Sequence, residues 1–145
     1  MIIYTIGFTK KTAEVFFEAL RSTGARHLLD IRLHNTSQLA GFTKRDDLRY
    51  FLGRVLGMEY HEAPVLAPDE DALRAYRKSS DWTSFEQCYL TGLRQRQAER
   101  LVDRALFEQG AVLLCSEPKP ERCHRRLAAE YLKGQLLLNA VIAHL

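Results

Sequence analysis

The sequence contains no long hydrophobic run. None of the apolar stretches in its 145 residues approaches the roughly 20 residues that a membrane-spanning helix needs. At the amino terminus, apolar residues precede the first lysines, which is the reverse of their order in a secretory signal peptide. We therefore expect a cytoplasmic protein that does not interact with membranes.

Cysteine is also scarce, and the glycine-rich phosphate-binding motifs are missing. Three cysteines are an odd number and too few for a disulfide scaffold, so we expect free thiols. Neither G-x-G-x-x-G nor G-x-x-x-x-G-K-[ST] occurs, which excludes a dinucleotide fingerprint and a P-loop. The net charge of +3 is smaller than the usual electrostatic footprint of a dedicated nucleic-acid-binding protein.

The overall composition is that of a globular protein. Hydrophobic residues make up 46% of the chain and charged residues 27%, which excludes the disordered and low-complexity classes. The length is sufficient for one hydrophobic core. We predict a single domain over residues 1–145.

Apolar runs alternate with helical patterns along the chain. Strands are predicted at 1–6, 26–31 and 111–115, an edge strand at 58–63 and a closing strand at 140–144. Helices are predicted from a cap at Thr9 to Gly24, then at 43–56, 69–78, 83–108 and 122–133. This order predicts an α/β fold in which helices cover both faces of a mainly parallel sheet of about five strands.

The predicted buried strands all become polar at their carboxyl ends. In an open parallel sheet, ligands bind in the crevice at this edge. The residues that the strands would bring together there are Thr5, Gly7, Asp30, Arg32, Cys115, Ser116 and Glu117. Ser37, Gln38 and Phe42, in the loop after the second strand, are weaker candidates. Each feature alone also has a structural explanation, such as an Asp30–Arg32 ion pair.

The segment 115–126, CSEPKPERCHRR, carries the strongest local signal. It places Cys123, His124, Arg125 and Arg126 in the first turn of a helix, where the helix dipole favours anions and disfavours cations. An anionic partner would offset that cost. A thiol in these surroundings should have a lowered pKa and a raised reactivity.

Three kinds of chemistry fit these residues. Cys115 or Cys123 could be a nucleophile that His124 serves as a base, although adjacent side chains on a helix diverge by about 100°. The two cysteines could instead form a reversible disulfide. Cys115, Glu117, Cys123 and His124 could also bind a metal ion, which is the least favoured of the three because the spacing C-x-E-x5-C-H matches no standard zinc pattern. Cys88, in the middle of a predicted helix, should be buried in helix packing.

Three blocks of the sequence resemble the family called domain of unknown function 488, over nearly the full length of the chain. They are Tyr4-Thr5-Ile6-Gly7, Asp30-Ile31-Arg32, and Leu114-Cys115-Ser116-Glu117 with Cys123-His124-Arg125-Arg126. The stretch 35–48, NTSQLAGFTKRDDL, is similar to one subgroup. Many members have His-Ser after the opening glycine, where this chain has Phe8-Thr9, so no role of that histidine carries over. The resemblance implies a shared site without a settled activity, and it leaves any cofactor open.

We expect an enzyme that binds an anionic small molecule or nucleotide-like substrate at the carboxyl edge of the sheet. In this hypothesis Arg32, Arg125 and Arg126 hold the anion, a cysteine supplies the thiol, and Asp30, Glu117 or His124 transfers protons. The alternatives are a nucleotide- or nucleic-acid-binding module without turnover, and an interaction protein in which the C-H-R block is structural. Arg125 in particular should pair with the carboxylate of Asp30 or Glu117, or contact an anion. The sequence leaves the oligomeric state open.

Overall fold

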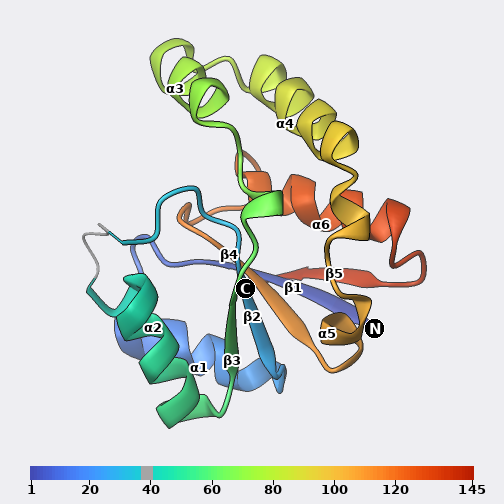
Figure 1. The fold of residues 1–145 in the computed structure, drawn as a ribbon. Coiled ribbons are helices and arrows are strands. Elements are labelled where there is room, and N and C mark those ends of the chain that lie inside the picture. Colours follow the sequence, from blue (N-terminus) through green and yellow to red (C-terminus); the bar gives the residue numbers. More distant parts are fainter. Residues whose placement is uncertain (37–40) are drawn as a thin grey trace.

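The structure is a computed structural model that describes residues 1–36 and 41–145. The described residues contain one sheet of five parallel strands in the order β3-β2-β4-β1-β5 (Figure 1). The strands are β1 (Ile2–Gly7), β2 (His27–Asp30), β3 (Glu59–Glu62), β4 (Ala111–Cys115) and β5 (Val141–His144). All five predicted strands are present, and the predicted α/β fold is confirmed.

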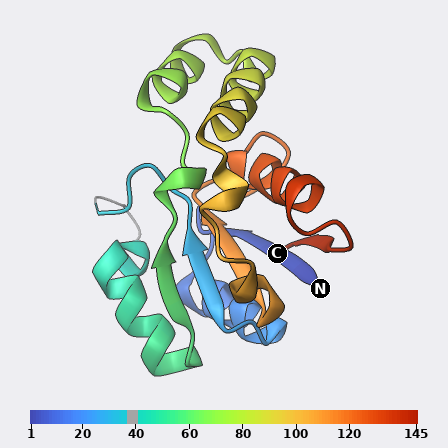
Figure 2. The same ribbon diagram turned by 45° about the vertical axis from the view of Figure 1, so that its right-hand side comes forward.

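Helices cover both faces of this sheet. The α-helices are α1 (Ala13–Thr23), α2 (Arg45–Phe51), α3 (Glu70–Ser79), α4 (Trp82–Arg96), α5 (Arg104–Glu108) and α6 (His124–Gln135). A π-helical turn, η2 (Leu52–Leu56), continues α2, and 3₁₀ turns are η1 (Gly41–Thr43), η3 (Pro64–Leu66) and η4 (Ala98–Arg100). In Figures 1 and 2, α3 and α4 form a hairpin beyond the carboxyl ends of the strands.

The apolar runs form strands because both faces of the sheet are buried. Leu28 and Leu114 pack against α1 and α2, and the neighbouring positions Leu29 and Leu113 pack against α4, α5 and α6. Since successive side chains of a strand point to opposite faces, a strand that is buried on both faces is apolar throughout. Such strands can therefore be predicted directly from the sequence.

The predicted helix over 83–108 is wrong, because the chain leaves the α-helical conformation after Arg96. Gln97 has a left-handed backbone with φ of 51°, and a new helix, α5, begins after Asp103. The Asp103 carboxylate caps α5 by accepting the Ala105 N–H at 2.9 Å. Cys88 is exposed on α4, which corrects the prediction that helix packing buries it.

The first helix begins later than predicted. Its cap is Thr12, whose hydroxyl accepts the Val15 N–H at 3.2 Å, and not Thr9. The backbone N–H of Thr9 instead donates to the Ser116 carbonyl at 3.0 Å. This bond ties the end of β1 to the loop that follows β4.

The carboxyl ends of the central strands meet at one edge, as predicted. Gly7 is in register with Cys115, and Asp30 with Leu114.

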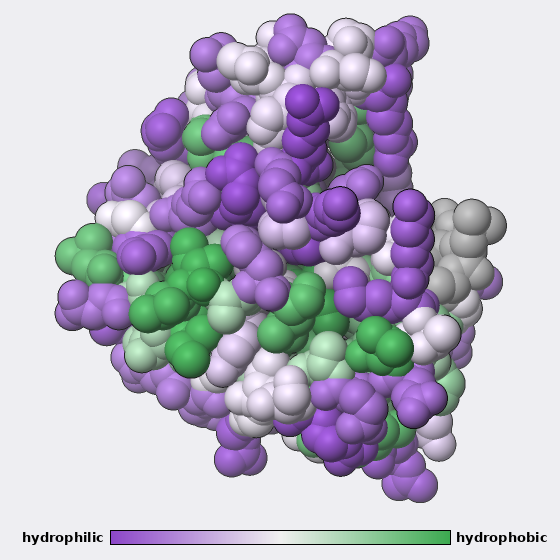
Figure 3. All heavy atoms as spheres, turned by 180° about the vertical axis from the view of Figure 1, so that it is seen from behind, coloured by the Kyte–Doolittle hydropathy of each residue, from purple (hydrophilic) through white to green (hydrophobic). Residues whose placement is uncertain are grey.

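On the surface seen from behind (Figure 3), apolar side chains form separate patches among hydrophilic ones. Among the described residues, no helix combines the length and hydrophobicity needed to cross a membrane.

Candidate functional site

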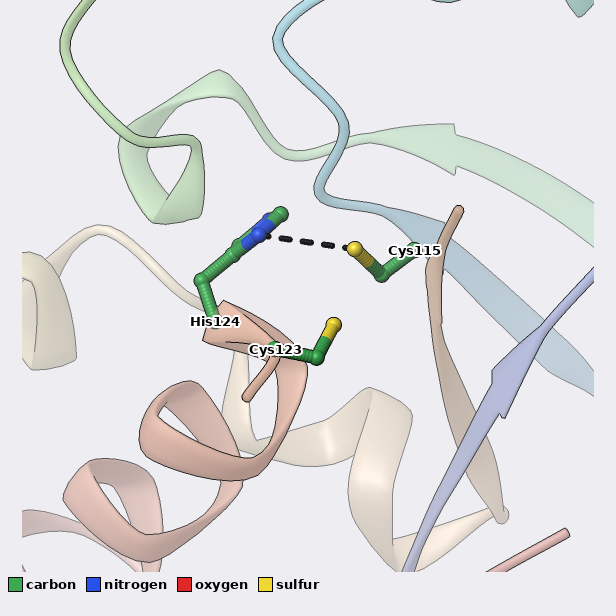
Figure 4. Close-up of side chains that lie close together, drawn as sticks. All are labelled: Cys115, Cys123 and His124. Carbon is green, nitrogen blue, oxygen red and sulfur yellow. Dashed lines mark hydrogen bonds between the residues drawn. The ribbon is translucent and has the colours of Figure 1, made fainter. Parts of the chain in front are cut away.

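A buried cysteine and a buried histidine meet at the carboxyl edge of the sheet. Cys115 is the last residue of β4, and His124 is the first residue of α6. The Cys115 Sγ lies 3.4 Å from the His124 Nδ1 (Figure 4). The His124 Nε2 lies 2.8 Å from the Ile31 carbonyl oxygen. Because a carbonyl can only accept, Nε2 carries a proton and Nδ1 faces the sulfur.

The surroundings of the Cys115 thiol favour its ionised form. Burial alone raises the pKa of Cys115, but the hydrogen bond from Cys123, the charge and hydrogen bond of His124, and the Glu117 N–H together hold that pKa well below its usual value. Burial lowers the pKa of His124, but the Cys115 charge together with the hydrogen bonds to Cys115 and to the Ile31 carbonyl raises that pKa above its usual value. Both shifts favour a thiolate–imidazolium pair.

Cys123 supports this pair from the position just before α6. Its sulfur accepts the Arg125 N–H as the N-cap, and its pKa is raised by the hydrogen bond to Cys115 and by burial. It remains a protonated donor to the Cys115 thiolate. The ligand atoms of Cys115, Cys123 and His124 lie within 4.8 Å of one another, and these donor types also bind zinc. All three cysteines are free thiols.

A pocket of about 150 Å³ opens onto the two sulfurs and the imidazole. One wall is aromatic, and the charged groups are predominantly arginines. The aromatic residues are Tyr76, Trp82 and Phe85 of the α3–α4 hairpin, and the arginines are Arg32, Arg77 and Arg122. Arg77 and Arg122 are exposed and form no ion pair with any residue in the described parts of the chain. The pocket is thus small and carries an excess of positive charge.

Arg125 is buried at this edge, but its partners differ from those expected. Its guanidinium donates from Nη1 to the Glu117 carbonyl and from Nη2 to the Pro118 carbonyl at 3.5 Å, and not to a carboxylate. It makes no ion pair with a described residue, and its Nε has no hydrogen-bond partner there. Arg125 therefore holds the loop after Cys115 in place and adds a buried positive charge.

Gly7 makes room for this arrangement. A Cβ atom on Gly7 would lie 1.7 Å from the Glu117 carbonyl oxygen and 2.2 Å from the Arg125 Nη1. Both distances are far below any real carbon contact. The glycine of the first sequence block and the arginine of the third are thus packed directly against one another.

Asp30 and Arg32 form a buried ion pair next to the pocket. The Arg32 Nε and Nη2 donate to the two Asp30 carboxylate oxygens at 2.8 and 2.7 Å, and the Tyr60 hydroxyl donates to the same carboxylate at 2.5 Å. Both carboxylate oxygens of Asp30 are therefore engaged by Arg32, and one of them also by Tyr60. The Arg32 Nη1 has no hydrogen-bond partner among the described residues. Arg32 also lines the pocket.

The other predicted site residues differ in whether they line the pocket. Glu117 lines its mouth, whereas the Thr5 hydroxyl is hydrogen bonded to the His144 Nδ1 at 2.6 Å. Arg126 faces Glu130 on the surface of α6, where Nη1 contacts Oε1 at 3.0 Å. Ser37 and Gln38 lie outside the described residues.

Sequence reasoning missed Tyr60 and the arginines of the pocket mouth. Tyr60 belongs to the edge strand β3 and reaches Asp30 because the two strands are adjacent. Arg77 and Arg122 come from α3 and from the loop before α6, which only the folded chain brings together. The alternation of residues 58–63 located β3, but no local pattern indicated these contacts.

Comparison with known proteins confirms the family resemblance over residues 12–132. The family described as "Domain of unknown function DUF488" matches residues 12–132, which include Asp30, Cys115 and His124. No curated protein and no solved structure matches the chain. The match covers most of the 145 residues, so this chain belongs to the DUF488 family.

Proposed function

We propose that this protein is a thiol-dependent enzyme in which Cys115 is the nucleophile and His124 is its proton partner. The observation that carries the proposal is the Cys115 Sγ–His124 Nδ1 contact of 3.4 Å, with the opposite ring nitrogen bonded to the Ile31 carbonyl. A histidine oriented by a third group and facing a cysteine is the usual arrangement for an activated thiolate. The contact lies at the base of a pocket and is therefore open to a ligand.

The proposed substrate is a small anionic molecule. The His124 imidazolium balances the single Cys115 thiolate, and the buried Arg125 guanidinium, which does not line the pocket, adds a positive charge close enough to act on His124. Arg77 and Arg122 line the pocket as well, and neither forms an ion pair with a residue that the structure describes. A pocket of about 150 Å³ suits a small molecule, since typical drug-sized sites are roughly 300–1,000 Å³.

In the proposed reaction, Cys115 is the nucleophile and His124 transfers the protons. The thiolate attacks an electrophilic atom of the substrate, a bond forms from sulfur to that atom, and the leaving group departs with its electron pair and takes a proton from the His124 imidazolium. His124, now neutral, removes a proton from water, which displaces the sulfur and regenerates the thiolate. The net reaction is hydrolysis of the substrate. The Glu117 backbone N–H lies at Cys115 and stabilises the sulfur anion before attack.

A binding module for nucleic acid is less well supported by the same residues. The C-H-R block would have to present its guanidinium groups to phosphates. Arg125 is fully buried, and Arg126 is paired with Glu130. The cations that remain available, Arg77 and Arg122, flank a small pocket and not an extended face.

The thiolate is tested by alkylation with iodoacetamide between about pH 6 and pH 9, with each cysteine followed by peptide mass spectrometry. We expect the labelling of Cys115, relative to the exposed Cys88, to rise as the pH falls. An ordinary thiol loses reactivity about tenfold per pH unit below its pKa, whereas a thiolate keeps it. His124→Gln should abolish this difference in pH dependence. A constant Cys115 to Cys88 ratio at all pH values would refute the proposal.

The preference for anions is tested by comparing iodoacetate with iodoacetamide. These reagents have the same reactive carbon, but only iodoacetate carries a negative charge. Relative to Cys88, we expect Cys115 to favour iodoacetate, and we expect the preference to fall in an Arg77→Ala, Arg122→Ala double variant and at high salt. An unchanged ratio in the double variant would contradict the assignment of these arginines.

The proximity of the two sulfurs supports a second candidate, a dithiol that cycles with a disulfide. Cys115 and Cys123 would lose two electrons and two protons to a small disulfide such as oxidised glutathione. Cys123→Ser separates the two functions, because a serine hydroxyl still donates to the Cys115 thiolate but forms no disulfide. Nucleophilic chemistry survives this substitution, whereas dithiol chemistry does not.

A further inference from the structure

A second cluster of ionisable side chains lies at the opposite end of the sheet. It consists of His27 at the start of β2 and of Glu59 and His61 on the adjacent β3. His27 is in register with Glu59, and Glu59 and His61 are two residues apart, so the three side chains share one face of the sheet. This end of the strands points away from the α3–α4 hairpin (Figures 1 and 2) and is separate from the Cys115 pocket.

The ligand atoms of the cluster converge. The His27 Nδ1 lies 3.1 Å from the His61 Nε2, and the Glu59 Oε2 lies 3.7 Å from each of these nitrogens. Two imidazole nitrogens bound to zinc at about 2.0–2.1 Å in a tetrahedral arrangement are roughly 3.3 Å apart. The observed spacing of the two rings is therefore close to that of a metal-bound pair. Glu59 is largely exposed, so its carboxylate can move the remaining distance without disturbing the core.

The orientation of His27 also suits a ligand. Its Nε2 lies 3.1 Å from the Gln109 Oε1, which can only accept, so Nε2 carries the proton and Nδ1 presents a lone pair to the cluster. A ligand histidine whose other nitrogen donates to a second residue is typical of metal sites. His27 itself is buried, which fixes its ring.

His61 can supply the second nitrogen. Its Nε2 faces the His27 Nδ1, and a neutral imidazole can carry its proton on the opposite nitrogen, Nδ1. His61 is partly exposed and Glu59 is largely exposed, so an ion with its water can reach the cluster from solvent.

We propose that His27, Glu59 and His61 form a binding site for a divalent transition-metal ion of the Zn²⁺ class, with water completing the coordination. Two histidines and one carboxylate with an open fourth position are a common zinc donor set. The site is independent of the Cys115 chemistry, because it shares no residue with it.

Co²⁺ is the probe that separates this site from the cysteines. A thiolate ligand gives bound Co²⁺ an intense sulfur-to-metal charge-transfer band in the near ultraviolet, whereas nitrogen and oxygen ligands give only weak visible bands. We expect the first equivalent of Co²⁺ added to the intact reduced protein to produce the weak visible bands alone. A charge-transfer band at the first equivalent would place that ion on Cys115 and Cys123 and overturn the proposal.

Zn²⁺ binding by variants assigns the ligands. By isothermal titration calorimetry, we expect Glu59→Gln and His61→Gln each to weaken Zn²⁺ binding by roughly 100-fold or more, and Gln109→Leu, which leaves all three ligands in place, to weaken it about 10–100-fold. His34→Gln removes a histidine outside both clusters and should leave the affinity unchanged. Glu59 is on the surface, so its substitution tests the site even if His61→Gln misfolds. Wild-type affinity in the Glu59 and His61 variants would show that the cluster is only a hydrogen-bonded histidine pair.

Discussion

Gly7→Ala is the substitution that most directly probes how the site is built. The added Cβ would lie 1.7 Å from the Glu117 carbonyl oxygen, and an ordinary contact is about 3.4 Å, so the 116–118 loop must recede by more than 1 Å. The same Cβ would lie 2.2 Å from the Arg125 Nη1. A flexible side chain could move aside cheaply, but a backbone carbonyl and a buried guanidinium cannot.

The cost follows from these contacts. Overpacking of this kind costs about 1–3 kcal/mol. Weakening the hydrogen bond between the charged Arg125 and the Glu117 carbonyl adds roughly 1.5–3 kcal/mol. The lower backbone entropy of alanine in the unfolded chain returns about 0.5–1 kcal/mol. We therefore expect Gly7→Ala to lower the free energy of unfolding by about 3–4 kcal/mol, which is a large share of the roughly 5–15 kcal/mol of a typical domain.

Chemical denaturation of purified Gly7→Ala, followed by circular dichroism, measures this loss. The matched control is Gly134→Ala near the end of α6, where an added Cβ meets no atom within 4 Å. There we expect a gain of about 0.5 kcal/mol from the better helix propensity of alanine. If Gly7→Ala and Gly134→Ala had the same free energy of unfolding, the close packing of the loop and Arg125 against β1 would be refuted.

Three further substitutions test the buried polar contacts by the same denaturation assay. Arg125→Lys keeps the charge but loses the planar fork, so we expect a loss of about 2 kcal/mol, whereas Arg126→Lys on the surface should change stability by less than about 0.5 kcal/mol. Asp30→Asn leaves the buried Arg32 without its counter-charge, and we expect a loss of about 3 kcal/mol; an unchanged midpoint would contradict the ion pair. Tyr60→Phe removes one hydrogen bond to Asp30 and should cost about 1–2 kcal/mol, so a loss as large as that of Asp30→Asn would contradict its secondary role.

The strands and their common edge were predictable because the relevant physics is local. A parallel strand that is buried on both faces is apolar throughout, and helices between such strands force a parallel connection. The polar residues at the carboxyl ends of β1, β2 and β4 are therefore expected to meet at one edge of the sheet. Asp30 and Cys115 are accordingly predicted to lie at one edge of the sheet, and the register confirms it.

The helix break after Arg96 was not predictable in this way. The apolar positions from Tyr89 to Ala105 continue at helical spacing through the break, so the periodicity alone indicates one helix. Gln97 adopts a left-handed conformation, which is not predictable from the presence of a glutamine. The cap at Asp103 was visible only as an acidic residue among arginines.

The partners of the site residues depended on tertiary structure. The interpretation of Arg125 assumed that a buried cation meets a carboxylate, whereas the loop turns its backbone carbonyls toward the guanidinium. The Cys115–His124 contact follows from where the loop places the start of α6. Cys123 is the extended N-cap residue before α6, and His124, the first residue of the helix, faces the cysteine at the end of β4.

The central claim, a thiolate at Cys115 near neutral pH, is tested most directly by titrating the ultraviolet absorbance of the thiolate in the wild type and in Cys115→Ser. Because the pKa of Cys115 is lowered, we predict one thiolate per chain at pH 7 that disappears as the pH falls through that pKa. The signal should be missing from Cys115→Ser and should move to higher pH in His124→Gln. Identical titrations of the wild type and Cys115→Ser up to alkaline pH would contradict the claim.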